Sequence, residues 1–182
     1  MIETNSGKRL FGNRIPKDFF VTEGEGHSDI TVHAGSYHLA LRDAGIGMCN
    51  MMNYSSILPK IAREIEHPEK AVHGSVMESI MAVSTCNKGE RTTAAVIYGW
   101  LYDKNTREKF GGLVCEYNGP EAIDVAEKEL WQSLNELYVN GYSDDYDLCD
   151  IKIISKSIEA KKRFGTVLVA LCFTSYEFPE IE

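Results

Sequence analysis

The sequence predicts an α+β fold, a layered αββα-type sandwich of mainly antiparallel strands with two principal helices. Two observations support this prediction. Segments rich in β-branched and aromatic residues outnumber helical segments and are separated by short polar turns. Two segments, 34–44 and 120–140, instead have the apolar spacing of helices that cover a sheet. Because the 182 residues contain neither a repeat nor a long flexible linker, we expect one domain spanning 1–182.

The first part of the chain is predicted to contain a strand, a loop and a short helix. Residues 18–22 (DFFVT) are typical of a strand, and the polar stretch 23–29, which contains two glycines, predicts a mobile or ligand-facing loop. The partly helical pattern of 34–44 ends at Gly45, a residue that commonly terminates helices. The stretch 58–70 is interpreted as a connector.

Strand patterns dominate the rest of the chain. A meander of three antiparallel strands is predicted at 71–85, 92–103 and 110–117. A helix then follows, with Pro120 at its first position. One apolar stripe of this helix comprises Ile123, Ala126, Leu130, Trp131, Leu134, Leu137 and Tyr138. Two further strands are predicted at 150–158 and 166–176.

Composition excludes several classes of function. The net charge is −8 and the basic residues are scattered, so the chain lacks the basic stripe of a nucleic-acid-binding protein. No apolar run is long enough for a membrane span or a secretory leader, and we expect a cytoplasmic protein without a membrane partner. The histidines show no zinc-type spacing, so no metal is expected. No CxxC pair occurs among the five cysteines, which are Cys49, Cys86, Cys115, Cys149 and Cys172.

Four segments share a more specific pattern. They are ALRDAGIGMCNMMNYSSILPK at 40–60, GSVMESIMA at 74–82, GGLVCEYNG at 111–119 and KKRFGTVLVALCF at 161–173. In residue type, order and spacing, this set resembles the pyruvoyl-dependent arginine decarboxylase family over roughly residues 15–175. A Ser-Ser pair alone would be weak evidence, but the AGIG segment before it and the strand GLVCEY after it make the resemblance specific.

The resemblance implies that the chain cleaves itself between Ser55 and Ser56 into a β chain, 1–55, and an α chain, 56–182. Ser56 would become a covalent pyruvoyl group, the cofactor, and only Ser, Thr or Cys can begin such a step. Asn50 would line the site and orient the processing or substrate groups. A degenerate relative that stays uncleaved, as a non-catalytic oligomeric protein, is the alternative from another class.

Two glutamates lie within apolar strand patterns. Glu116, in GGLVCEY, corresponds to the proton donor of the family, and burial would raise its pKa so that the acid form persists near neutrality. Strand alternation also permits the alternative that Glu116 faces solvent. The role of Glu78 stays open, with a structural ion pair as the preferred interpretation.

Substrate recognition departs from the family pattern. The family places a carboxylate for the substrate guanidinium on the first helix, where this chain has His38, with Arg42 one turn further and Gly47 nearby. Arginine, converted to agmatine, is the preferred substrate, and a different amino acid with an acidic or polar side chain is the competing hypothesis. A carboxylate of the predicted loop could replace the missing group: Glu23, Glu25 or Asp29. The resemblance also implies a homotrimer or a hexamer.

Overall fold

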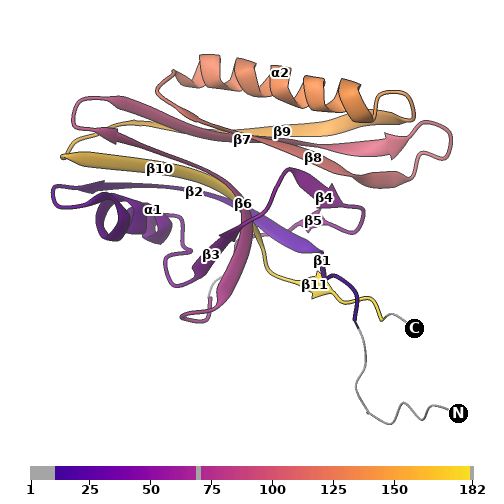
Figure 1. Cartoon of the computed structure of the whole chain (residues 1–182), viewed down its shortest axis with the longest axis horizontal. Helices are drawn as coiled ribbons and strands as arrows, with labels where there is room; N and C mark the ends of the chain where they lie inside the picture. Colours follow the sequence, from indigo (N-terminus) through magenta and orange to yellow (C-terminus); the bar gives the residue numbers. More distant parts are fainter. Residues whose placement is uncertain (1–10, 69–70, 181–182) are drawn as a thin grey trace, which may run out of the picture.

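The computed structural model describes residues 11–68 and 71–180 and contains two β-sheets packed face to face, each with a helix on its outer side (Figure 1). The first sheet has the order β3 (Asn50–Asn53), β6 (Val76–Asn87), β10 (Phe164–Phe173), β2 (Asp18–Ser28), β5 (Arg63–Glu64). The second has the order β4 (Ile57–Pro59), β8 (Lys109–Gly119), β7 (Arg91–Asp103), β9 (Tyr146–Glu159). A small ladder joins β1 (Ile15–Pro16) to β11 (Tyr176–Glu177). The predicted α+β sandwich is confirmed.

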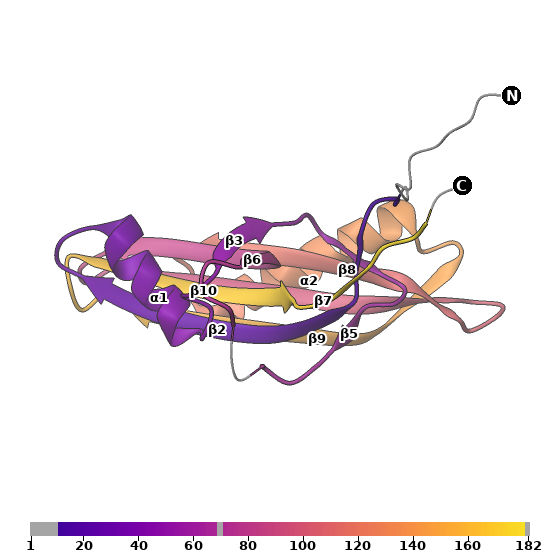
Figure 2. The ribbon, with the colours of Figure 1, turned by 90° about the horizontal axis from the view of Figure 1, so that it is seen from below.

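The helices cover opposite outer faces. A π-helical segment, Val32–Tyr37, continues into α1, His38–Asp43, and the two pack on β2 and β10, whereas α2, Ile123–Gly141, packs on β7, β8 and β9. Figure 2, which views the molecule from below, shows α1 lying across β2 and α2 on the far side of the sandwich. Among the described residues, neither helix has a stretch long and apolar enough to cross a bilayer.

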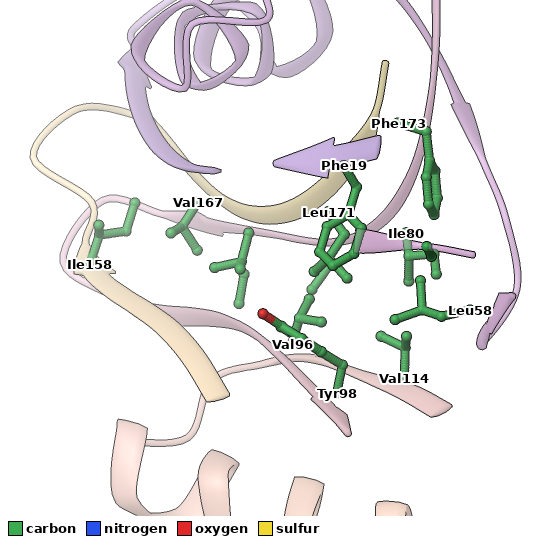
Figure 3. Close-up of a cluster of buried hydrophobic side chains, with 14 residues drawn as sticks. Phe19, Leu58, Ile80, Val96, Tyr98, Val114, Ile158, Val167, Leu171 and Phe173 are labelled. Atoms are coloured by element: carbon green, nitrogen blue, oxygen red, sulfur yellow. The ribbon is translucent and has the colours of Figure 1, made fainter. Parts of the chain in front are cut away.

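The main core lies between the two sheets. Inward-facing side chains of both sheets interdigitate there, with Phe19, Leu171 and Ile80 of the first sheet against Val96, Tyr98 and Val114 of the second (Figure 3). Two further clusters fill the space between each sheet and its helix. Burial of apolar area on both faces of the central strands accounts for their almost unbroken apolar sequences.

The predicted loop at 23–29 is wrong, because β2 continues without interruption to Ser28. The glycines that suggested a loop have another reason to be there. A Cβ at Gly24 would collide with the Ala40 carbonyl oxygen of α1, and one at Gly26 with the carbonyl oxygen of Ser36. Glycine therefore permits the helix to approach the strand closely, a use of strand glycines that local sequence does not distinguish from a turn.

Several element boundaries also differ from prediction. The predicted strand 71–85 begins only at Val76, and the predicted connector 58–70 contains part of the short strand β4 and all of β5. The predicted helix 34–44 begins at Val32 with a π-helical turn and ends at Asp43, followed by Gly45 at a φ of 76°. Residues 69 and 70 lie outside the described part of the chain.

The later elements shift in the same modest way. β9 starts at Tyr146, four residues before the predicted strand 150–158. The predicted strand 166–176 divides into β10 and the separate β11. Pro120 precedes α2 by three residues instead of occupying its first position. On the predicted helical stripe, Ile123 and Trp131 are exposed, whereas the residues Ala126, Leu130 and Leu134 are buried.

Candidate active site

The Ser55–Ser56 bond lies where the chain crosses from one sheet to the other. β3 forms one edge of the first sheet, β4 forms one edge of the second, and the serine pair connects them (Figure 1). On one side, the Tyr54 backbone N–H donates to the Ser79 carbonyl at 2.7 Å; on the other, the Val114 N–H donates to the Ser56 carbonyl at 2.9 Å. Both flanks of the bond are thus held by the backbone of different sheets.

The carbonyl group between the two serines is itself hydrogen-bonded. The Ile57 backbone N–H donates to the Ser55 carbonyl oxygen at 3.1 Å, and this i to i+2 bond closes a γ-turn around Ser56. Attack on the Ser55 carbonyl carbon would place negative charge on that oxygen, and a backbone donor already aimed at it stabilises such charge. Ser55 is exposed and Ser56 is half-buried.

Glu116 lies on β8, two residues beyond the Val114 that binds the Ser56 carbonyl. Alternation along the strand directs Glu116 and Val114 to the same face, and Val114 belongs to the core between the sheets. Burial raises the pKa of Glu116, and a contact with its own backbone N–H opposes that shift. A half-buried carboxyl group that holds its proton to higher pH thus lies on the strand that neighbours Ser56.

Glu78 takes part in an ion pair, the preferred interpretation of its role. Glu78 is only 2% exposed, and Arg14 Nε donates to Oε2 at 3.1 Å while Arg14 Nη2 contacts Oε1. The Tyr54 hydroxyl also donates to Oε2. Arg14 and Tyr54 line a hollow of about 530 Å³ together with Ser55.

The predicted substrate-binding residues gather at another place. His38, Arg42 and Gly47 line a hollow of about 450 Å³, joined there by Met48 and His73. Asn50 begins β3 close to this hollow, and its side-chain amide donates to the Gly74 carbonyl at 3.0 Å. The residues described as lining the hollow include no carboxylate. Both His38 and Arg42 are exposed.

The carboxylates proposed as substitutes for a guanidinium-binding group face elsewhere. Glu23 pairs with Lys156 of β9 at 3.1 Å, and Glu25 contacts the same ammonium group at 3.7 Å. They lie on the face of β2 opposite to the glycines that contact α1. Asp29 accepts a hydrogen bond from the Arg163 backbone. Within one copy, these three carboxylates have partners elsewhere and do not line the hollow at His38.

Two groups of site residues are separated by β3. The hollow with His38 and Gly47 lies at its first residue, Asn50, and the serine pair follows its last, Asn53. Three steps along a strand span about 10 Å. The structure places Ser56 beside Val114 of β8, the strand that also carries Glu116, but it does not bring the predicted substrate-binding residues to the serine pair within one copy.

Sequence reasoning missed three contributors to the serine site: Arg14, Tyr54 and the backbone N–H of Ile57. Arg14 lies 64 residues before its partner, and no local pattern relates the two. The sequence does offer a signal for Tyr54. A buried tyrosine hydroxyl and a carboxylate in an apolar strand both require hydrogen-bond partners, so the tyrosine beside the serine pair could have been matched with such a carboxylate. Among the described residues, no group of three or more His, Cys, Asp or Glu side chains is arranged to hold a metal ion.

The chain is similar to known proteins over most of its length. The model of the family described as "Pyruvoyl-dependent arginine decarboxylase (PvlArgDC)" matches residues 18–178. A pyruvoyl-dependent arginine decarboxylase of Methanococcoides burtonii is 41% identical over 119 residues, 56% of this chain and 64% of that protein. A probable pyruvoyl-dependent arginine decarboxylase of Chloroherpeton thalassium is 31% identical over 134 residues, 66% of this chain and 70% of that protein.

A longer match covers nearly the whole molecule. The pyruvoyl-dependent arginine decarboxylase AaxB of Chlamydia abortus is 30% identical over 186 aligned positions, 92% of this chain and 95% of that protein. These matches define the class as pyruvoyl-dependent decarboxylases. Within that class, the chain belongs to the pyruvoyl-dependent arginine decarboxylase family.

The residues at the serine site fit a pyruvoyl group. A pyruvoyl group is formed from a serine of the chain itself, and the peptide bond before that serine must be held in place. The γ-turn around Ser56 holds this bond. The group also requires an acid that can donate a proton, and burial raises the pKa of Glu116, which favours the protonated form of its carboxyl group.

Proposed function

We propose that the chain cleaves itself between Ser55 and Ser56 and that the processed enzyme decarboxylates L-arginine to agmatine. The observation that carries the proposal is the position of the serine pair, with the Ser55 carbonyl held by Ile57 and with Glu116 on the adjoining strand. The names of the relatives support arginine as the substrate.

Cleavage uses the side chain of Ser56 as the nucleophile. Its Oγ bonds to the Ser55 carbonyl carbon, the C–N bond breaks, and the hydroxyl proton passes to the freed amine, which leaves an ester. Loss of the Cα proton of residue 56 then breaks the Cβ–Oγ bond and releases the Ser55 carboxylate. Water hydrolyses the imine form of the resulting dehydroalanine, expels ammonia and leaves the pyruvoyl carbonyl. The products are the β chain, 1–55, and the α chain, 56–182.

Decarboxylation then uses both the cofactor and side chains of the protein. The pyruvoyl carbonyl supplies the electron sink for loss of CO2. Glu116 holds the proton that replaces the lost carboxylate, because its buried carboxyl stays protonated to higher pH than an exposed one. His38, Arg42, Gly47 and Asn50 form the substrate-binding side of the site.

We propose a homotrimer, alone or paired into a hexamer, in which a second copy completes the site. Support comes from the separation of the serine pair from the hollow at His38, and from exposed Met52 and Val76 on the edge strand β3 and its neighbour β6. A second copy could bring a carboxylate to the hollow, where the substrate guanidinium needs one. The cytoplasm is the proposed compartment, since all five cysteines are free thiols.

The test combines intact mass with an activity assay. Purified wild-type protein should yield two chains whose summed mass equals the precursor plus water minus ammonia, and it should release agmatine from arginine. Ser56→Ala should stay whole and inactive. A wild-type protein that remains one chain would refute self-cleavage, and a cleaved protein that releases CO2 from another amino acid but not from arginine would refute the substrate.

A further inference from the structure

Arg14, Glu78 and Tyr54 form a cluster to which the proposed function gives no chemistry. Glu78 is the third residue of β6 and is 2% exposed. An ionised carboxylate at such a place is costly unless it is paired and hydrogen-bonded. Arg14 binds both of its oxygens, and Tyr54 donates to one of them. We refer to these three residues as the Arg14–Glu78–Tyr54 cluster.

Tyr54 links the cluster directly to the serine pair, because it is the residue that precedes Ser55. Three contacts restrain it: its backbone N–H binds the Ser79 carbonyl, its ring lies 5.5 Å from that of Phe173, and its hydroxyl binds Glu78. β3 ends at Asn53, so these contacts are the last restraint before the Ser55 carbonyl.

The cluster also connects the first described segment of the chain, which contains Arg14, with the last one, which contains Tyr176. The Arg14 guanidinium lies 5.6 Å from the centre of the Tyr176 ring, and burial raises the pKa of that tyrosine to about 12. Ile15 and Pro16 pair with the strand that contains Tyr176. The hollow beside Ser55 is therefore walled by the segment that Arg14 anchors.

We infer that the Arg14–Glu78–Tyr54 cluster positions the Ser55 carbonyl for attack by Ser56, so that all three are positioning residues for self-cleavage. This inference rests on the proposed cleavage and adds residues to it. Attack requires that the reacting atoms lie about 3–3.5 Å apart and are correctly aligned. Backbone motion on either side of the Ser55–Ser56 bond lowers the population of conformations with that geometry. On the Ser56 side, Val114 and Ile57 restrain the backbone; on the Ser55 side, the Tyr54 hydroxyl supplies the side-chain restraint.

The inference is tested by Tyr54→Phe, which removes the hydroxyl and keeps the ring against Phe173. The full chain is made by cell-free translation, and the fraction cleaved is followed by denaturing electrophoresis. Cleavage should be slowed about tenfold or more, the scale of losing one oriented hydrogen bond to a charged group. Its Tm should fall by no more than that of the control variant described next, so that a general loss of stability does not account for slower cleavage.

Tyr98→Phe is the matched control. The Tyr98 hydroxyl donates to Glu64 at 2.7 Å, and Glu64 is paired with Lys152, so the control also loses a part-buried bond from a tyrosine hydroxyl to a paired glutamate, while its ring belongs to the core between the sheets. It should cleave at the wild-type rate. Equal cleavage rates for Tyr54→Phe and wild type, or equal slowing of both tyrosine variants, would overturn the inference. Failure of wild type itself to cleave would overturn the proposed function as well.

Discussion

At the scale of single residues, the stability of the folded state depends on the protonation of Glu116. The folded state holds the proton of this half-buried carboxyl above the ordinary pKa of 4.5, so the folded chain binds more protons than the unfolded chain in that window. Stability contributed by this group is therefore lost as pH rises from about 4.5 through the raised pKa, because deprotonation costs more in the folded state.

Glu116→Gln removes this titration and leaves a neutral side chain of the same shape. We expect its Tm to exceed that of wild type at pH 8 and to match it near pH 4, and we expect kcat to fall ~100-fold because the positioned acid is lost. Thermal unfolding at both pH values and steady-state kinetics measure these effects. Glu136→Gln, a change at an exposed position of α2, is the control. An equal Tm difference at both pH values would contradict the proposed burial effect.

His38 lines a hollow together with Arg42, and the described residues that line it include no carboxylate. His38→Ala should therefore change KM for arginine only slightly, because the imidazole does not pair with a guanidinium. His38→Asp should lower KM by about tenfold, since a carboxylate and a guanidinium form a charge-assisted pair. His33→Asp makes the same change at an exposed residue outside the hollow and should leave KM unchanged. A large rise in KM for His38→Ala would show instead that the imidazole binds the substrate.

At the scale of elements, the contact between β2 and α1 depends on glycine. The carbonyl oxygen of Ala40 lies where a Cβ of residue 24 would be placed. Gly24→Ala should therefore destabilise the protein by about 1–3 kcal/mol, the usual effect of overpacking a contact that cannot relax. Denaturant unfolding measures this change.

Gly141→Ala separates steric from conformational effects. Gly141 is the last residue of α2, and a Cβ there would meet nothing within 4 Å. Alanine favours the helical state over glycine by up to about 1 kcal/mol, so this variant should be neutral or more stable. Similar destabilisation by both substitutions would indicate that the β2–α1 contact is looser than the structure describes.

At the scale of the whole molecule, both products of the proposed cleavage contribute to one sheet. β2 and β3 belong to 1–55, and they pair with β10 and β6 of 56–182 along ten and four residue pairs. The two chains should therefore elute together in gel filtration and unfold in a single transition, separating only in denaturant. Elution of a folded 56–182 chain without its partner in native buffer would contradict this prediction.

Much of the serine site could be predicted from the sequence. The strand and helix content and the place of Glu116 in an apolar strand follow from residue type and short-range periodicity, which report on immediate neighbours and on burial. The Ser55–Ser56 pair was identified only through the resemblance of the motifs around it to the family. The same periodicity located α2 to within a few residues. Family resemblance added roles for these residues, because a shared order of motifs reflects a shared fold.

Tertiary structure alone decided which distant residues meet. The pairing of Arg14 with Glu78, the continuation of β2 under α1 and the separation of His38 from Ser56 depend on strand register and on packing between elements far apart in the chain. Local sequence patterns cannot predict these features, because a glycine in a turn and a glycine beneath a helix look the same in the sequence. The sequence therefore determined which groups are proposed to carry the chemistry, and long-range contacts determined where each one is held.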